Sequence, residues 1–435
     1  MTKPIIIDKI SHSIDTNKHV LIHGPGGTGK SYLIKTLAYH LRHNKNRDVL
    51  LTASTGIAGV NIGGTTFHSA FCLGLAKGKI EDVVKQVLRN KRKNKIKKYD
   101  IVIVDEISMI PKHVLEIVDK SCREIRNEMS HMSFGGIQFV FIGDFLQLPP
   151  VNGDWVFNSS VWKELDMDYY TLSQPKRFTC DSFFNALMRF REGKYTQKDL
   201  LQIQKRKRAY NEYIEQLHQE TDIQPTVLYS TRKSVAQEND EKNNALTHKA
   251  YTYNAMDSVI LPPASKLNPK QLLEQQTNTL ELIAPKSLEL KFGSQVMITR
   301  NIDINSGLCN GTRGVVVDFV NDNPKIKLHK TNAHATLPQV ELEYSTDEFT
   351  IIRKQIPLIL AFSSTIHKSQ GSTLDFCVID IGTDIFTDAQ AYVALSRARS
   401  WDSMLIKQFI PKSIRANSDA LNYAHEIEEQ SVYIE

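Results

Sequence analysis

The sequence predicts an α/β protein of two lobes, the second of which is interrupted by a small β-barrel. Three observations support this fold class. The first half alternates short apolar runs with helical patterns, the alternation returns after residue 225, and five strand candidates with little helix pattern between them lie within 292–356. Near-continuous apolar runs separated by helices are typical of a parallel sheet covered on both faces. The chain has 435 residues, 41% of them hydrophobic, which is enough for such a core.

The first lobe is expected over residues 1–175. Its strand candidates are the apolar runs HVLIHG, DVLLTA, DIVIVDE and IQFVFIGD, with helical patterns between them. After the third strand, one helix carries apolar side chains on one face, which predicts burial of that face. These residues are Val114, Leu115, Val118, Cys122 and Ile125. The aromatic residues Trp155, Phe157 and Trp162 are expected in the core rather than on a stacking surface.

The second lobe is expected over 176–291 and 357–435, with the barrel inserted over 292–356. A strand at PTVLYS begins the lobe, and the α/β pattern resumes at LILAFSSTIHKSQG, FCVIDI and AQAYVALSRA. The five strand candidates of the insertion are FGSQVMITR, GVVVDFV, KIKLHK, VELEYS and FTIIRKQI. Short strands with no helices between them favour a barrel.

Positive charge is concentrated in two places, although the net charge is only +6. One cluster, RNKRKNKIKK over 89–98, lies in a basic insertion at about 72–99, and the other is KRKR over 205–208. Lysine and arginine clusters suit a phosphate backbone, because each neutralised phosphate releases counterions. For the first cluster a solvated loop, a nucleic-acid contact and a nuclear import signal all stay open, since basic runs alone are weak motifs.

The cysteines and the apolar segments suggest a compartment. The five cysteines are scattered and odd in number, without a CxxC or Cys/His ligand spacing, which favours free thiols in a reducing environment. No apolar run is long enough for a signal peptide or a membrane span. We therefore expect a soluble intracellular protein of the cytoplasm or nucleus, of viral or bacterial origin among others, without a mitochondrial targeting sequence.

The stretch GPGGTGKS fits the pattern GxxxxGK[ST] directly after a strand and before a helix. Glycines allow backbone N–H groups to turn towards phosphate oxygens, and the helix N-terminus adds partial positive charge. Lys30 is expected to reach the β and γ phosphates, and the Ser31 hydroxyl to ligate magnesium. The residues expected to hold the nucleotide, ATP, are Gly24, Pro25, Gly26, Gly27, Thr28, Gly29, Lys30 and Ser31.

Two further strands end in polar residues. Asp105 and Glu106 follow IVIV, where Asp105 would hold Mg²⁺ and Glu106 would orient and polarise the attacking water. Asp144 and Gln147 follow FIG, where both are expected to sense the γ-phosphate. An acidic pair or a glutamine after a strand is also compatible with a plain surface turn; the phosphate loop upstream favours the catalytic interpretation.

The ordered motifs resemble those of the petite-integration-frequency (Pif) family of superfamily 1 DNA helicases. They are GPGGTGKS, TASTGIAGVNIGGTTFHS, DEISM, FGGIQFVFIGDFLQLPPV, LYSTRKSV, NGTRGVVVDF, TIHKSQGSTLD and YVALSRARS, which together span about 19–409. The resemblance implies two RecA-like P-loop lobes, ATP between them, and an SH3-like β-barrel inserted in the second lobe. It further implies 5′-to-3′ translocation on single-stranded DNA, with 5′-tailed or forked duplex DNA as substrate and a functional monomer.

The resemblance also assigns residues. Arg397 in ALSRA would be an arginine finger, Arg177 in QPKRF a second γ-phosphate contact, and Gly371 part of the nucleotide site. An ion-pairing or helix-capping role is the alternative for Arg397, and the local pattern around Arg177 is short. A structural role is the alternative for His68 and His367. The residues expected to contact the DNA strand are Thr55, Thr66, His68, Thr231, Arg232, Thr365, His367 and Lys368.

One departure from the superfamily concerns recognition of the adenine base of the nucleotide. No glutamine precedes Gln86, so the usual upstream adenine-reading glutamine is missing and selectivity for ATP over GTP is open. Within the signature, Ser133 and Cys122 stand where the family usually has Pro and Ala, which predicts adjusted packing with activity retained.

The alternatives to a helicase are a single-strand translocase or RNA helicase, and a nucleotide-switched binding module. The complete hydrolytic set disfavours the switch, and the pathway served is not encoded in these motifs.

Overall fold

The computed structural model describes residues 3–74, 76–215, 224–262, 265, 267–277, 280–281, 284–300, 302–303, 306–329, 331–345 and 349–434. They form two compact units, unit 1 with residues 1–210 and 366–435 and unit 2 with residues 211–365. The lobe boundaries expected from the sequence differ from this division and stay a prediction.

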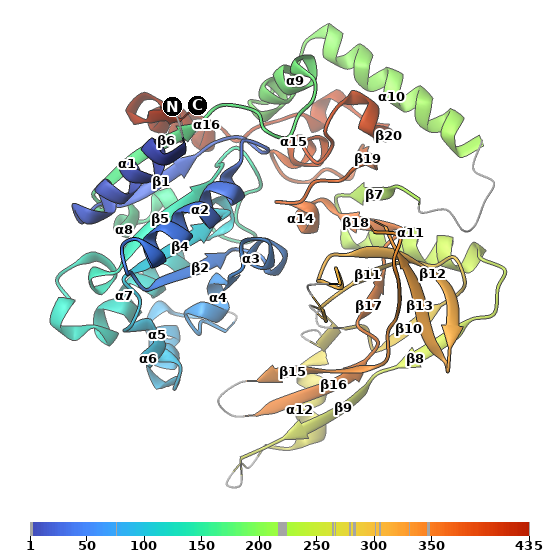
Figure 1. Ribbon diagram of the computed structural model, residues 1–435, viewed down its shortest axis with the longest axis horizontal. Helices are drawn as coiled ribbons and strands as arrows, with labels where there is room; N and C mark the ends of the chain where they lie inside the picture. Colours follow the sequence, from blue (N-terminus) through green and yellow to red (C-terminus); the bar gives the residue numbers. More distant parts are fainter. Residues whose placement is uncertain are drawn as a thin grey trace. The chain divides into compact units, whose positions relative to one another are not determined.

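Unit 1 is built on a sheet of seven strands in the order β21-β6-β1-β5-β4-β2-β3. All pairings between these strands are parallel, as expected from their near-continuous apolar runs. The α/β class with a parallel sheet is thereby confirmed (Figure 1). The strands are β1 (His19–His23), β2 (Val49–Ala53), β3 (Thr65–Thr66), β4 (Ile101–Asp105), β5 (Gln138–Gly143), β6 (Met167–Leu172) and β21 (Val432–Ile434).

Helices cover both faces of this sheet, because alternate strand residues point to opposite sides. Leu21 and Val102 join one core cluster and Val20 and Ile101 the other. The first cluster includes residues of α4 (Phe67–Ala70), α5 (Ile80–Arg89), α7 (Lys112–Ile125), α8 (Ser160–Lys163) and α16 (Ser418–Gln430). The second cluster includes residues of α1 (Lys3–Asp15), α2 (Lys30–His43) and α3 (Gly56–Ile62).

The core predictions for this unit are confirmed. The five apolar residues predicted on one face of α7 are all buried, and so are Trp155, Phe157 and Trp162. The Trp162 Nε1–H donates a hydrogen bond of 2.6 Å to the Tyr423 hydroxyl of α16. The C-terminal segment thus packs on the first sheet, where β21 also pairs with β6.

Unit 1 contains two further strands, which are not part of the seven-stranded sheet, and further helices. Strands β19 (Cys377–Ile381) and β20 (Met404–Phe409) pair in parallel. The helices are α6 (Lys93–Ile96), α9 (Asp181–Arg191), α10 (Gln197–Glu215, whose last residues belong to unit 2), α14 (Ile366–Ser369) and α15 (Gln390–Leu395).

Unit 2 contains all five strand candidates of the expected insertion, but they do not pair into one sheet. A five-stranded sheet has the order β14-β13-β12-β11-β17, whereas β15, β16 and β9 form a separate sheet in that order. The remaining pairs are β10 with β8, antiparallel, and β18 with β7, parallel. The strands are β7 (Thr226–Tyr229), β8 (Tyr251–Asn254), β9 (Met256–Ile260), β10 (Ser287–Leu290), β11 (Gln295–Ile298), β12 (Arg313–Val320), β13 (Asn323–Leu328), β14 (His334–Thr336), β15 (Val340–Ser345), β16 (Thr350–Gln355), β17 (Leu358–Leu360) and β18 (Ser363–Thr365), and the helices are α11 (Arg232–Ala245) and α12 (Pro269–Gln275).

Helix length and polarity also bear on membrane insertion. Among the helices in the described part of the chain, not one combines the length and apolar character needed to cross a bilayer.

A buried histidine in the central strand predicts acid sensitivity of the fold. The His19 ring lies in β1, and its Nδ1 accepts a hydrogen bond of 3.0 Å from the Phe139 N–H. Burial lowers the pKa of His19 from 6.5 to about 4, so the unfolded chain binds a proton before the folded protein does. The stability that the neutral, buried His19 ring gives to the folded state is therefore complete above the unfolded pKa. It is lost as the pH falls through the folded pKa, and this loss amounts to at most ~3 kcal/mol.

We expect His19→Gln, which keeps a hydrogen-bond acceptor but does not titrate, to reduce the loss of thermal stability between neutral pH and pH about 5. The matched control is His131→Gln, because His131 is exposed in a loop of the same unit. Equal acid sensitivity of wild type and His19→Gln would contradict the assignment.

Candidate active site

The phosphate loop, residues 24–29, connects β1 to α2 and has a backbone that requires glycine. Gly27 and Gly29 have φ of 84° and 96°, values that residues with a side chain rarely adopt. A Cβ on Gly24 would lie 2.6 Å from the Leu172 carbonyl oxygen of the neighbouring strand. Helix α2 then begins at Lys30 without a side-chain cap, so its positive end is open to an anion.

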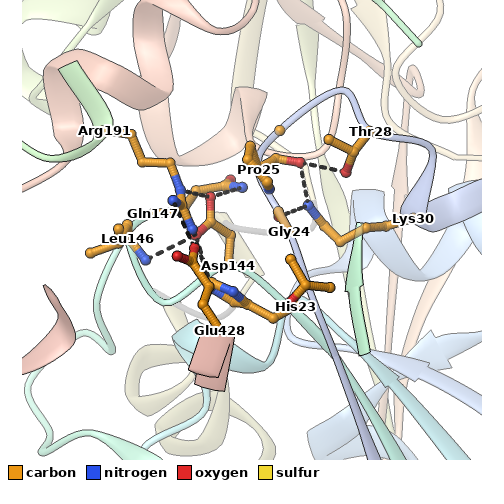
Figure 2. A network of polar contacts seen from close by, with 12 residues as sticks. His23, Gly24, Pro25, Thr28, Lys30, Asp144, Leu146, Gln147, Arg191 and Glu428 are labelled. Carbon is orange, nitrogen blue, oxygen red and sulfur yellow. Dashed lines mark hydrogen bonds and ion pairs between the residues drawn. The ribbon is translucent and has the colours of Figure 1, made fainter. Parts of the chain in front are cut away.

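Lys30 turns back onto the loop that precedes it. Its buried ammonium donates hydrogen bonds of 2.7 and 2.9 Å to the carbonyl oxygens of Gly24 and Pro25 (Figure 2). Burial lowers the pKa of Lys30, and the carboxylates of Asp144, Glu106 and Asp105 partly oppose that shift. A desolvated ammonium with neutral partners is suited to a phosphate group that enters the loop.

Asp105 and Glu106 form the acidic side of the site at the end of β4. Both are buried, and the Glu106 N–H donates a 2.9 Å hydrogen bond to Asp105 Oδ1. Glu106 has a φ of 55°, an unfavourable conformation for a residue with a Cβ, as is often found at functional sites. Burial, with the Glu106 charge second, raises the pKa of Asp105 to about 7. A nearby cation would therefore favour the ionised form.

Two arginines form the basic side of the site. Arg397 is 1% exposed, and its guanidinium donates hydrogen bonds to the carbonyl oxygens of Val393, Ser369 and Ser372. Arg177 Nη1 donates a hydrogen bond of 2.9 Å to the Ser396 carbonyl oxygen. Burial, followed by the charge of Arg397, lowers the pKa of Arg177 to about 9. Two guanidinium groups are thus held close together mainly by uncharged backbone oxygens.

The structure adds two residues that the motifs did not single out. Gln370 Nε2 donates a hydrogen bond of 3.1 Å to Glu106 Oε2, and the Tyr392 hydroxyl accepts one of 3.1 Å from the Gly26 N–H. Both side chains are buried. They lie within the quoted runs TIHKSQG and YVALSRA, but a glutamine or tyrosine in a run carries no signal of its partner.

These groups surround one pocket of about 560 Å³. Five of its lining residues are cationic and two are carboxylates, an excess of positive charge that suits a polyphosphate. Ser31 and Asp105 supply a hydroxyl and a carboxylate, the oxygen ligands that Mg²⁺ prefers. The lining residues are Gly26, Gly27, Gly29, Lys30, Ser31, Tyr32, Asn61, Asp105, Glu106, Gln147, Lys176, Arg177, Gly371, Thr373, Arg397 and Arg399.

The expectation that Asp144 faces the γ-phosphate is wrong, whereas Gln147 does line the pocket. Asp144 is fully buried and is paired with Arg191 of α9, whose Nη2 lies 2.8 Å from Asp144 Oδ1. His23 Nε2 lies 3.3 Å from the same oxygen (Figure 2). The Arg191 charge and the His23 hydrogen bond hold the pKa of Asp144 far below its usual range despite burial.

The residues expected to contact DNA are divided between the two units. Thr55, Thr66, His68, His367 and Lys368 belong to unit 1, and Thr231, Arg232 and Thr365 belong to unit 2. The hydroxyls of Thr66 and Thr231 cap the helices α4 and α11 by accepting hydrogen bonds from the Ser69 and Ser234 N–H groups.

Burial divides these candidates further. Thr365 is buried, whereas Arg232 and Lys368 are exposed. His367 stacks on Phe386 with ring centroids 5.9 Å apart, and burial lowers the pKa of His68. The surroundings of both histidines fit the structural alternative, and their contact with DNA stays a prediction.

Comparison with known protein families gives two matches along the chain. A model described as PIF1-like helicase matches residues 3–199. A model described as the 2B domain of DNA helicase Pif1 matches residues 277–319.

Individual relatives extend these matches over nearly the whole chain. The ATP-dependent DNA helicase Pif1 of Bdellovibrio bacteriovorus is 31% identical over 421 residues, 95% of this chain and 89% of that protein. The ATP-dependent DNA helicase PIF1 of Danio rerio is 33% identical over 95% of this chain, which spans only 62% of that relative's length. The crystal structure of Pif1 helicase from Candida albicans superimposes with a TM-score of 0.84 at 32% identity, covering 97% of this chain and 98% of that one.

The loop geometry predicts that Gly27 cannot be replaced without loss of phosphate binding. With φ at 84°, a Cβ on Gly27 would lie 2.8 Å from Phe178 Cε2 and 2.9 Å from Arg177 Cβ. We expect Gly27→Val to weaken the affinity for a fluorescent ATP analogue by about tenfold or more, because the strained loop loses its shape but no charge. Gly56→Ala is the control, since no atom lies within 4 Å of the added carbon. Wild-type affinity in Gly27→Val would contradict this account of the loop.

Proposed function

Because the chain belongs to the PIF1-like helicase family, we propose that it is an ATP-dependent DNA helicase that moves 5′ to 3′ on single-stranded DNA. One observation carries the proposal: a single pocket of about 560 Å³ contains the phosphate loop, the acidic pair, Gln147 and two arginines. A module that used nucleotide only as a switch would not need this complete set. The names of the relatives supply the DNA substrate and the dependence on ATP.

Each group in the pocket has a role that follows from its chemistry. The phosphate loop and Lys30 bind the β and γ phosphates, and Glu106 orients and polarises the attacking water. Arg397 and Arg177 stabilise the negative charge that develops as the phosphate is transferred, with Gln147 facing the same region. Ser31 and Asp105 would hold Mg²⁺, which neutralises charge on the phosphates when it is bound.

The finer architecture belongs to the same proposal. We assign residues 1–175 to a first RecA-like lobe, residues 176–291 and 357–435 to a second, and residues 292–356, which carry most of the five-stranded sheet of unit 2, to the SH3-like barrel. The match of residues 277–319 to the 2B domain supports this assignment, because that range includes β11 and most of β12. The eight threonine, histidine, arginine and lysine residues named above would contact single-stranded DNA, with a 5′-tailed or forked duplex as substrate and the monomer as the working unit.

The experiment that tests this function compares two matched duplexes, one with a 5′ single-stranded tail and one with a 3′ tail, under ATP and Mg²⁺. We expect strand separation of the 5′-tailed duplex only. Unwinding from the 3′ tail would contradict the polarity. DNA-stimulated ATP hydrolysis without separation of either duplex would favour a translocase, and stimulation by RNA alone would favour an RNA helicase.

Removing the proposed arginine finger should affect turnover more than binding. We expect Arg397→Ala to bind ATP nearly as well as wild type but to hydrolyse it about 10³-fold more slowly, because the finger acts on transition-state charge. Arg399→Ala serves as the comparison: Arg399 lines the same pocket, but its side chain is 52% exposed and paired with Asp375 at 3.1 Å. A solvated arginine should contribute much less. A pure loss of ATP affinity in Arg397→Ala would remove its finger role.

The basic insertion offers a separate prediction about DNA binding. Arg89, Lys91, Arg92, Lys95 and the pair 97–98 are exposed on and around α6. If they contact phosphates, their replacement by glutamine should weaken single-stranded DNA binding and reduce the salt dependence of the binding constant by about one power of salt per lost contact. Filter binding across a salt series measures both. An unchanged affinity and slope would favour the solvated loop.

A further inference from the structure

Three buried polar side chains lie behind Gln147 and outside the pocket lining. Arg191 Nε lies 3.1 Å from both carboxylate oxygens of Asp144, and Arg191 Nη2 lies 2.8 Å from Asp144 Oδ1. The guanidinium therefore binds the carboxylate through two of its nitrogens. His23 Nε2 is 3.3 Å from Arg191 Nη2 as well as from Asp144. Figure 2 shows the three side chains converging from β1, the loop after β5 and α9.

The clamped carboxylate shapes the loop that carries Gln147. Asp144 Oδ1 accepts a hydrogen bond of 3.1 Å from the Leu146 N–H, and the Gln147 N–H bonds to the Asp144 carbonyl oxygen at 3.0 Å. The other carboxylate oxygen, Oδ2, accepts a bond of 3.4 Å from Gln147 Nε2. One aspartate thus holds both the backbone of the turn and the side chain of Gln147.

The chemistry of a carboxylate also fixes which way the Gln147 amide points. An ionised carboxylate only accepts hydrogen bonds, so it selects the amide NH₂ and turns the amide oxygen away. Gln147 Oε1 is buried and has no hydrogen-bond partner within the part of the chain that the structure describes. Gln147 is among the residues that line the pocket, and an unpaired amide oxygen there suits a donor. The attacking water is a donor, whereas a phosphate oxygen is not.

Stability alone does not explain why these charges are buried. A buried ion pair often contributes no more than apolar side chains of the same shape, because desolvation offsets the attraction. The network has an outer member, Glu428 of α16, but its carboxylate lies 3.8 Å from Arg191 Nη1 and is 34% exposed, so solvent screens it. The inner three groups are therefore the ones that determine geometry.

We propose that Arg191 and His23 hold Asp144 so that it fixes the polarity of the Gln147 amide, whose oxygen then orients the attacking water. This inference rests on the proposed ATPase function and names the atom of Gln147 that acts and the residues that position it. Asp144, Arg191 and His23 are positioning residues, since they act through Gln147 and do not line the pocket.

The test uses Asp144→Asn in the full-length chain, because an asparagine amide is nearly isosteric but no longer selects the NH₂ end of Gln147. We expect kcat of DNA-stimulated ATP hydrolysis to fall about 10²-fold, with KM for ATP and the affinity for a non-hydrolysable analogue within about threefold of wild type. Normal turnover, or a parallel loss of affinity and kcat, would overturn the proposal.

A double-mutant cycle separates positioning from a general structural effect. Adding Asp144→Asn to Gln147→Ala should reduce kcat no further, because the aspartate acts only through that glutamine. Independent, multiplying effects would refute the coupling. If Asp144→Asn does not fold, the neutral pair of Asp144→Asn with Arg191→Gln removes both buried charges together, and the same kcat loss and the same cycle apply to it.

The control is Arg189→Gln on the same helix. Arg189 Nη2 pairs with Asp199 at 2.6 Å, but the arginine side chain is 36% exposed and lies outside the pocket lining. Its replacement should leave kcat within about twofold of wild type; a loss as large as that of Asp144→Asn would refute a specific role for the network. Absence of ATP hydrolysis by the wild-type chain would instead refute the proposed function, so the two failures are distinguishable.

Discussion

The parallel pairing of β1 with its neighbours is the constraint on which the site depends. His23 of β1 is opposite Gly143 of β5, and the N–H of Gly24, the residue after β1, bonds to the Gly143 carbonyl oxygen at 3.1 Å. β5 in turn pairs with β4, which ends at Asp105. Because parallel strands end at the same edge, the phosphate loop, the acidic pair and the Gln147 loop emerge side by side. A shift of one residue in either pairing would turn these side chains towards the opposite face.

Electrostatics explains what this edge can bind. Positive groups exceed carboxylates in the pocket, and burial shifts the pKa values of Lys30, Arg177 and Arg397 downwards. Each of these shifts reports that the charged form lacks the solvation that it would have in water. A polyphosphate would provide the missing opposite charge, and its binding would offset part of this desolvation cost. The same desolvation raises the pKa of Asp105, for which Mg²⁺ would be the compensating charge.

The C-terminal part of the chain contributes residues to this edge. Residues 366–435 cluster with the first sheet and bring Gln370, Tyr392 and Arg397 against the phosphate loop and Glu106. Helix α16 packs its apolar face into the same core as α7, so the position of the C-terminal segment is tied to the largest apolar cluster of unit 1. Residues more than two hundred positions apart in the sequence therefore form one site.

The sequence by itself determined the parallel α/β class, the phosphate loop, the acidic pair and the apolar face of α7, because each depends on local spacing within one element and its flanking turn. It did not determine the partners of polar residues: Asp144 looked like a γ-phosphate sensor, yet it binds Arg191 and His23, which lie 47 and 121 positions away. The five strand candidates within 292–356 were also correctly predicted, while their division into two sheets was not. Strand pairing and buried ion pairs are contacts between distant segments, and only the tertiary structure decides which segments meet.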